Sequence, residues 1–370
     1  MVRTSRIRLD RIASSTRNAR LGPDVTVGED IVAREGYVLA VRILEDKSTY
    51  NTVEDPTGRM VALRAGDVLA GTLGSRRALR GYAGDVPERI AVGDVINVLN
   101  LGGILGRCTS SNPDIGPPFR AEVLGAVLAF PDLGDRIGRP ATIMEGAVPA
   151  AEVLEAALPV VYVAGTCMNA GKTVAATELV RGLSRSGLRV AACKLTGVSL
   201  MRDTLSMQDA GAIVALTFND AGAASTHAGM TVPVARGLLN RLAKAPAGGL
   251  GTRPDVVVAE LGDGILGEYG VQDILRDPGL MALGVAHVMA APDPVACWGA
   301  HQLFTAHHHL AITCFTGPAT DNQVGRDFIT RQLGVPAHNA LRDADGLLGT
   351  VQAALNQAGN AGMAPRLEVG

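Results

Sequence analysis

One glycine-rich stretch, residues 165–173, has the clearest chemical meaning in this sequence, because it ends in glycine, lysine and threonine. Such a stretch, lying between a buried strand and a helix, binds nucleotide phosphates with its backbone N–H groups and the positive end of the helix. It predicts that Lys172 reaches the β- and γ-phosphates and that the Thr173 hydroxyl binds Mg²⁺. The residues expected to contact the nucleotide here are Gly165, Thr166, Asn169, Ala170, Gly171, Lys172 and Thr173.

The spelling of this stretch departs from the usual G-x-x-x-x-G-K-[ST] pattern. Counting back from Lys172 puts Thr166 where the first glycine is expected, and Gly165 stands one place earlier. The flanking sequence still favours a phosphate loop, because an apolar run at 159–164 precedes it and apolar residues at helical spacing follow it over 174–186. We therefore expect a strand, a phosphate loop and a helix in succession.

Two more charged residues end apolar runs that are typical of buried strands. Lys194 ends the run at 190–194, and Glu260 ends the run at 255–260, just before a glycine-rich turn. Ligands of open parallel sheets lie beyond the carboxyl ends of the strands, so both residues are candidates for the nucleotide site. Glu260 is expected to bind Mg²⁺ directly or through water, since this hard cation favours carboxylates beside phosphates. Asp263 is a further acid in the same turn, and its role is open.

Together, the phosphate loop and these two strand ends resemble the dethiobiotin synthetase family and its relatives, which include the cobyrinic acid amide synthetases. The resemblance covers about residues 159–340 and rests on three short stretches, while residues 1–150 carry no resemblance that identifies a family. It implies that Lys194, at the end of the strand beside the phosphate-loop strand, binds a reacting carboxylate or carbamate and the transferring phosphate. Thr196 and Ser199 are the nearby hydroxyls.

The same resemblance implies a Mg²⁺-associated aspartate between Lys194 and Glu260. Asp209 is the preferred candidate, and Asp203 is the alternative. The metal set expected from the sequence is then Thr173, Glu260 and Asp209, and the catalytic set is Lys172, Lys194 and Glu260.

The segment 316–322 follows another apolar run and precedes a helix, at a place where P-loop proteins of this class read the base. Asp321 and Asn322 are the candidates for this contact, and an ordinary helix cap by Thr320 or Asp321 is the alternative. No Asn-Lys-x-Asp guanine signature occurs, so ATP is the expected nucleotide and GTP the alternative.

The two halves of the chain have different patterns. From about residue 20 to 130, glycine-aspartate pairs at Gly66, Gly84 and Gly93 precede valine-rich runs, which predicts short strands joined by turns in a small barrel or sandwich. After a connector at 131–140, apolar runs alternate with helix-length segments, which predicts a mostly parallel sheet. We expect a β-rich domain at 1–145 and a P-loop α/β domain at 146–370. The strands expected in the latter are 159–164, 189–193, 255–259, 285–290 and 310–315.

Composition limits the remaining function classes. The chain has 370 residues and a formal charge of −2, without runs of like charge, so neither a nucleic-acid nor a membrane surface is predicted. Its five cysteines are scattered and odd in number, which favours a reducing cytoplasm over a disulfide framework. The N-terminus lacks the apolar core of a signal peptide. The adjacent histidines at 307–309 are more typical of a polar helix end than of a metal site.

Taken together, these features favour an ATP- and Mg²⁺-dependent ligase-like enzyme, in which the γ-phosphoryl group passes to a small carboxylate before amide bond formation. A nucleotide-hydrolysing switch or accessory protein, similar to the P-loop proteins of molybdenum-cofactor assembly, is the main alternative. A small-molecule kinase is the third. The expected partners are a small-molecule carboxylate and a second copy of the chain.

Overall fold

The computed structural model describes residues 3–155, 158–244 and 253–360, and the chain forms two compact units. The first unit comprises Met1–Val148 together with two short later segments, Val198–Arg202 and Phe218–Ser225. The second unit comprises Pro149–Gly197, Asp203–Thr217 and Thr226–Gly370. The sequence predicts a single cut near residue 145, and it gives no sign that two later loops join the first unit.

Strand pairing closes the first unit into a barrel. β4 (Val38–Ile43) pairs with β7 (Val68–Leu73), β7 with β11 (Ile104–Ser111), β11 with β10 (Val95–Val98), β10 with β12 (Phe119–Ala129), and β12 again with β4. This ring answers the choice between barrel and sandwich that the sequence left open. The flanking strands are β1 (Thr4–Arg8), β2 (Arg11–Ile12), β3 (Asp24–Gly28), β5 (Thr52–Glu54), β6 (Met60–Ala62), β8 (Arg76–Arg77), β9 (Tyr82–Asp85) and β13 (Arg139–Pro140).

The predicted glycine-aspartate turns are present at two of the three positions. Gly66 and Gly93 have φ of +91° and +89°, a left-handed conformation that glycine adopts without strain. Gly84 is different, because it lies inside β9, where a Cβ atom would be 2.5 Å from the carbonyl oxygen of Arg107 on β11. The glycine therefore permits close strand approach there, and the prediction of a turn at Gly84 is wrong.

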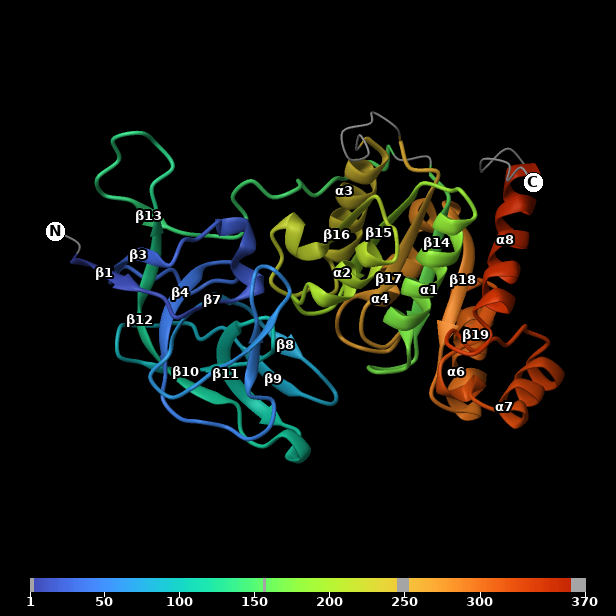
Figure 1. Cartoon of the computed structure of the whole chain (residues 1–370), viewed down its shortest axis with the longest axis horizontal. Coiled ribbons are helices and arrows are strands. Elements are labelled where there is room, and N and C mark those ends of the chain that lie inside the picture. The colour runs from blue at the N-terminus through green and yellow to red at the C-terminus, as the bar shows by residue number, and fades with distance from the viewer. Residues whose placement is uncertain (1–2, 156–157, 245–252, 361–370) are drawn as a thin grey trace. The chain divides into compact units, whose positions relative to one another are not determined.

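The second unit is an α/β layer structure. Within the described residues its sheet has the order β16–β15–β17–β14–β18–β19, and all paired strands are parallel (Figure 1). The strands are β14 (Val160–Gly165), β15 (Val190–Thr196), β16 (Val214–Thr217), β17 (Val256–Leu261), β18 (Gly284–Ala290) and β19 (Cys314–Thr316). Along the chain, a β-rich region is followed by an α/β region with a parallel sheet, which confirms the predicted fold class. The sequence analysis did not predict β16, although residues 212–216 form a short apolar run; this strand lies at the edge of the sheet, and its side chains are mostly half-buried.

Helices cover this sheet and bury its apolar side chains. The longer ones are α1 (Lys172–Arg185), α2 (Arg202–Asp209), α3 (Thr231–Lys244), α6 (Pro294–Leu303) and α8 (Ala344–Asn360), and the shorter ones are α4 (Val271–Arg276), α5 (Pro278–Ala282) and α7 (Gln323–Phe328). Leu179 and Leu183 of α1 share one core with Val351 and Leu355 of α8. Both helices therefore pack on the same apolar layer and fix the start of α1 beside the end of β14.

Two further features follow from the described residues. All five cysteines are free thiols. Across the residues described, we find no helix that combines the length and the apolar character needed to cross a membrane.

Candidate functional site

The glycine-rich loop lies where the sequence predicts it, between the carboxyl end of β14 and the start of α1. Gly171 has a φ of +100° and immediately precedes the helix, and Asn169 is also left-handed at +59°. The first helical residue is Lys172, so the free backbone N–H groups of the first turn of α1 belong to the loop end. The second unit therefore has the strand–loop–helix arrangement that the sequence predicts for a P-loop.

The unusual first position of the loop has a packing reason. A Cβ atom at Gly165 would lie 2.8 Å from Cγ and 2.9 Å from Cδ of Lys172, so the lysine stem passes directly over the glycine. The ammonium group of Lys172 then donates a hydrogen bond to the carbonyl oxygen of Cys167 at 2.8 Å, and only 6% of the residue is exposed. The position that must be glycine, so that the Lys172 stem has room, is therefore residue 165. The next residue, Thr166, carries a side chain where the usual pattern has its first glycine.

Two glycine turns from other strands pack against the loop backbone. A Cβ atom at Gly264 would be 2.6 Å from the carbonyl oxygen of Thr166, and one at Gly317 would be 2.2 Å from that of Ala170. These turns follow β17 and β19, at the same edge of the sheet as the loop. The loop is thus supported on both sides before any ligand is considered.

We expect Gly165→Ala to weaken nucleotide binding by about tenfold, because an added methyl group overpacks the Lys172 stem and such strain typically costs about 1–3 kcal/mol. The control is Gly349→Ala on α8, where an added Cβ atom meets nothing within 4 Å. Titration calorimetry with a nucleoside triphosphate measures both. Equal affinity in the Gly165→Ala and Gly349→Ala proteins would show that the lysine stem does not need this glycine.

Strand register brings the two predicted charged residues together. Lys194 on β15 and Glu260 on β17 are direct register partners, and their Nζ and Oε1 atoms are 3.9 Å apart. Oε1 of Glu260 also accepts a hydrogen bond from the Thr173 hydroxyl at 3.3 Å. The expectation that the strand of Lys194 lies directly beside the phosphate-loop strand is wrong. β17 lies between β14 and β15, so Lys194 is two strands away from the phosphate-loop strand.

The acid nearest to Lys194 on α2 is Asp203, to which the Lys194 ammonium donates a hydrogen bond within a buried ion pair. Asp203 is 8% exposed, whereas Asp209 lies exposed at the opposite end of the same helix. The structure therefore brings the alternative, Asp203, to Lys194, and it places Asp209 at the far end of the helix. Both aspartates fit the sequence pattern, and the structure shows that Asp203 is the one that pairs with Lys194.

Burial sets the electrostatics of this group. Desolvation raises the pKa of the Glu260 carboxyl, although the Lys194 and Lys172 ammonium groups act in the opposite direction. Desolvation likewise lowers the pKa of Lys172, and the Glu260 carboxylate acts against this. Within the described residues, Oε2 of Glu260 and the hydroxyl of Thr166 are buried without a hydrogen-bond partner. The site therefore keeps polar atoms that a ligand would satisfy.

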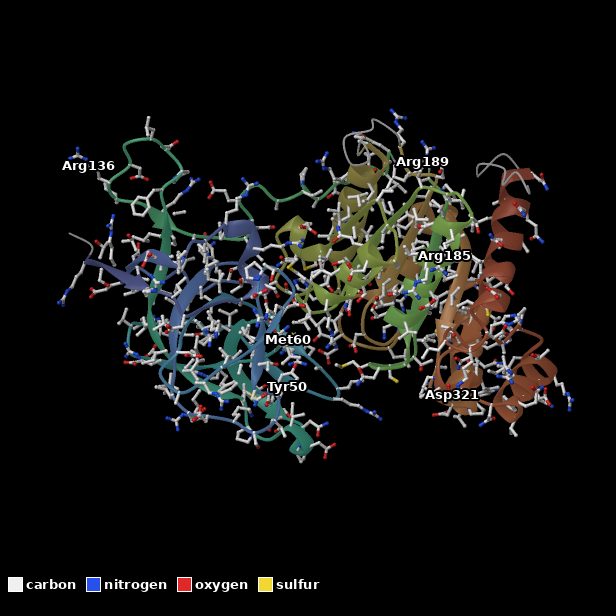
Figure 2. The ribbon with its side chains drawn as sticks, viewed as in Figure 1. Tyr50, Met60, Arg136, Arg185, Arg189 and Asp321 are labelled. Carbon is white, nitrogen blue, oxygen red and sulfur yellow. The ribbon has the colours of Figure 1, made fainter. Side chains whose placement is uncertain are left out.

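The side chains of the segment 316–322, which the sequence analysis expects to contact the base, already make hydrogen bonds within the protein. Asn322 caps α7 by accepting a hydrogen bond from the Gly325 N–H at 3.2 Å. The carboxylate of Asp321 (labelled in Figure 2) accepts one from the amide of Asn339 at 2.8 Å. Asn339 is 4% exposed, and the sequence analysis missed it because no motif surrounds it. Asp321 remains at the surface and can accept a further donor, while the Asn322 side chain serves the helix.

The remaining polar candidates have local roles. The Thr196 hydroxyl donates to the carbonyl oxygen of Gly262 at 2.9 Å, which fixes the turn after β17. Ser199 belongs to the first unit. Of the residues that the structure describes, no group of three or more His, Cys, Asp or Glu side chains is arranged to hold a metal by itself, the histidines at 307–309 included.

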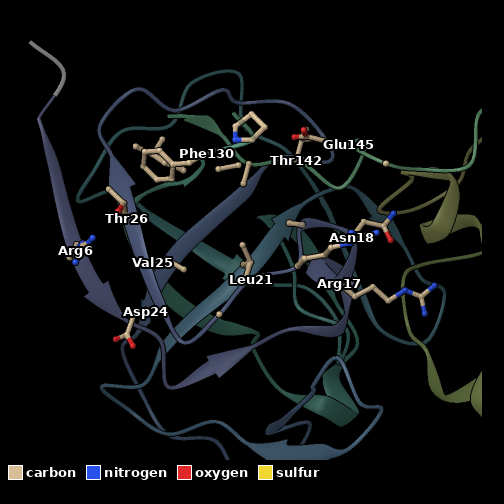
Figure 3. A pocket seen from close by; sticks show the side chains of 18 residues that line it. Arg6, Arg17, Asn18, Leu21, Asp24, Val25, Thr26, Phe130, Thr142 and Glu145 are labelled. Carbon is tan, nitrogen blue, oxygen red and sulfur yellow. The ribbon is translucent and has the colours of Figure 1, made fainter. Parts of the chain in front are cut away.

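A separate pocket of about 870 Å³ lies in the first unit (Figure 3). Its lining includes Arg6, Arg17, Leu21 and Phe130, and every lining residue belongs to the first unit. Arg17 is already paired with Asp220. The pocket contains none of the motif residues, and its mixed lining indicates no particular ligand.

Comparison with known proteins gives distant likenesses only. No protein-family model matches the chain, and no curated protein matches it in sequence. Chloroplast FtsY from Physcomitrella patens is similar over 56% of this chain and 70% of its own, at 13% identity and a TM-score of 0.36. FtsY from Thermotoga maritima is similar over 56% of this chain and 74% of its own, at 17% identity and a TM-score of 0.34. The hydrogenase maturation factor HypB from Archaeoglobus fulgidus is similar over 54% of this chain and 77% of its own, at 12% identity and a TM-score of 0.27.

Proposed function

We propose that this protein is a Mg²⁺-dependent nucleoside-triphosphate hydrolase, whose second unit binds the triphosphate on the loop at 165–173. The observation that carries this proposal is the contact of the Thr173 hydroxyl with Glu260, next to the buried Lys194–Asp203 pair. Thr173 and Glu260 lie at the end of the phosphate loop and on the neighbouring strand. They are the residue types that a hydrated Mg²⁺ ion needs beside phosphates.

The residues present fit a magnesium ion that depends on its nucleotide. Mg²⁺ keeps several waters and uses one or two carboxylates with substrate phosphates, rather than a cage made of protein alone. The unpartnered Oε2 of Glu260 and the hydroxyl of Thr173 fit this need, and Asp203 is the second carboxylate within the cluster. When bound, the ion would neutralise charge on the β- and γ-phosphates.

The protein's own residues supply position and charge. The backbone N–H groups at the start of α1 face the phosphates, and Lys172 exchanges its hydrogen bond with the Cys167 carbonyl for one with a phosphate oxygen. Lys194 adds a fixed cation at the strand ends, where charge moves during phosphoryl transfer. The water that accepts the phosphoryl group is oriented by a neighbouring carboxylate, for which Glu260 and Asp203 are the candidates.

A second candidate is the ligase-like enzyme, which the position of Lys194 favours. In that case Lys194 would release Asp203 and bind the carboxylate of a small substrate, which would take up the γ-phosphoryl group. We place it second because Lys194 is already neutralised by Asp203 and lies near Glu260, so a substrate carboxylate would have to displace one buried acid.

Phosphate release separates the two candidates. The hydrolase should release phosphate from ATP or GTP with Mg²⁺ alone, and a mixture of small carboxylates should not change the rate. A strict requirement for one carboxylate, with one phosphate released for each product formed, would favour the ligase. Parallel titrations with ATP and GTP identify the preferred nucleotide. The exposed carboxylate of Asp321 is a hydrogen-bond acceptor that a donor group of the base could contact.

We expect Glu260→Gln to bind triphosphate normally and to lose most Mg²⁺-dependent turnover, about 100-fold, because one anionic oxygen near the metal is replaced by an amide. The control is Glu178→Gln, a charge change at the Glu178–Arg181 pair on α1. Turnover is measured over a range of Mg²⁺ concentrations. Normal turnover of Glu260→Gln at limiting Mg²⁺ would assign the metal to another acid.

A further inference from the structure

A projecting loop of the first unit carries apolar side chains. The loop comprises residues 130–138, joins β12 to β13 and extends beyond β13 in Figure 1. Leu133 and Ile137 are exposed at its tip, and Phe130 is exposed at its base. Single exposed apolar residues are common on protein surfaces, but three so close together on one loop form a cluster of the kind that marks an interaction site.

Hydrogen bonds within the loop hold the tip in one conformation. Oδ1 of Asp135 accepts hydrogen bonds from the N–H groups of Ile137 at 2.9 Å and Gly138 at 3.0 Å. The Asp135 N–H donates to the carbonyl oxygen of Asp132 at 3.1 Å. Gly138 has a φ of +71°, and a Cβ atom there would lie 2.8 Å from the Phe130 ring, so the returning chain packs on this ring. A tip that is already ordered loses little conformational entropy when it binds a partner.

The pocket of the first unit lies at the base of this loop (Figure 3). Residues 128–131 line the pocket, whereas residues 132–138 do not, so the tip does not fill the pocket of its own barrel. Leu21 and Val25 provide further apolar lining. The volume of about 870 Å³ is in the range of sites that enclose a whole small ligand, so the pocket has room for the apolar side chains of such a tip.

The charges of the pocket and of the tip are complementary. Three charged side chains of the lining already have ion-pair partners, namely Arg17, Asp24 and Glu145. Arg6 and Arg20 also line the pocket, and among the residues that the structure describes neither has an acid as partner. The tip carries two acids, Asp132 and Asp135, against one cation, Arg136 (labelled in Figure 2), so its net charge is negative. A lining that mixes apolar and basic side chains therefore suits an apolar and acidic protein segment.

We propose that a second copy of this chain docks on the first unit, so that the tip of each loop enters the pocket of the other barrel. Loop and pocket share a rim, so a single two-fold axis can bring both contacts together in a closed, self-complementary interface. A second copy carries both the apolar, acidic tip and the basic pocket, which an unrelated partner need not have. The inference concerns the first unit alone and is independent of the proposed hydrolase activity.

Sedimentation of the full chain tests the loop. The wild type should be a dimer over about 1–100 μM, in the affinity range of an interface of ordinary size. Leu133→Asp should raise the dissociation constant of the dimer by about 100-fold or more, because the dimer loses two apolar anchors and places two carboxylates in the pockets. The control is Leu79→Asp, which changes another exposed leucine of the first unit, away from this loop, and should leave the dimer unchanged.

Gly22→Trp tests the pocket. Gly22 lines the pocket, and a Cβ atom there would meet nothing within 4 Å, so a larger side chain can occupy the pocket without displacing the barrel strands. This variant should dissociate the dimer as strongly as Leu133→Asp does. If Gly22→Trp does not fold, Arg20→Glu takes its place, because Arg20 is an exposed residue of the same lining. Reversal of this charge should raise the dissociation constant by about tenfold.

A mixture of the loop variant and the pocket variant tests whether the loop of one chain enters the pocket of the other. In a mixed dimer the pocket variant supplies an intact tip and the Leu133→Asp chain supplies an intact pocket, so one of the two contacts is restored. The equal mixture should therefore form dimers at concentrations at which each variant alone is monomeric. A monomeric wild type would overturn the proposal, and so would a dimer that both variants leave unchanged or a mixture that stays monomeric. Phosphate release is no part of this readout, so a failure of the proposed hydrolase function would leave the test unaffected.

Discussion

Replacing Lys172 by alanine is expected to weaken triphosphate binding by about 100-fold or more, because truncating one partner of a buried charged contact costs about 2–5 kcal/mol. The residue is nearly buried, and in the structure its ammonium group rests on the Cys167 carbonyl, where it can turn to a phosphate. Calorimetric titration with a non-hydrolysable triphosphate measures the affinity. Lys172→Met serves as control for packing, since it keeps much of the stem over Gly165 and removes only the charge.

The pH dependence of binding gives an independent check on Lys172. Burial lowers the pKa of its ammonium group in the free protein, whereas phosphate oxygens favour the charged form. Affinity should therefore fall as the pH rises through this lowered pKa, at a less alkaline pH than an ordinary lysine would give, and the fall should vanish in Lys172→Met. A folded Lys172→Ala protein with unchanged affinity would remove the P-loop assignment altogether.

Lys194→Met is expected to lower turnover by about 100-fold or more, because a preorganised cation at developing negative charge contributes about 3–4 kcal/mol. The structure adds a consequence for stability. The ion pair with Asp203 is buried, and the removal of one partner of a buried ion pair is destabilising, so the free energy of unfolding should fall by about 3 kcal/mol. Steady-state kinetics and urea unfolding measure the two effects separately.

The double variant Lys194→Met with Asp203→Asn distinguishes stability from chemistry. Neutralising Asp203 removes the charge that Lys194 balanced, so much of the unfolding free energy should return while turnover stays low. Recovery of both quantities would mean that Lys194 has only a structural role. Near-wild-type turnover in Lys194→Met alone would remove the cation from the mechanism and, with it, the ligase-like alternative that relies on Lys194.

The local elements of the second unit follow directly from the sequence. Apolar runs at 159–164, 255–259 and 285–290 became central parallel strands, because strands buried on both faces need continuous apolar residues. The loop before α1 was also predictable from local sequence. Its glycines let the backbone approach phosphates, and its lysine side chain reaches the β- and γ-phosphates, so the spacing of these residues is fixed. In the barrel, alternation and turns predicted strands, but the closing pair of β10 with β12 is a long-range contact that no local pattern contains.

The identity of the acids in the site was decided by tertiary structure. Asp203 and Asp209 stand at opposite ends of one short helix, roughly 9 Å apart along its axis, and the sequence alone treats them alike. Which of the two pairs with Lys194 depends on how α2 packs beside the end of β15, and no local sequence pattern contains that contact. Residue type and spacing therefore determined that a phosphate loop, a strand-end lysine and a strand-end glutamate exist. Strand register and helix placement decided which aspartate pairs with the lysine. The reason is that burial of the charged side chains and their pairing arise only when distant segments of the chain pack together.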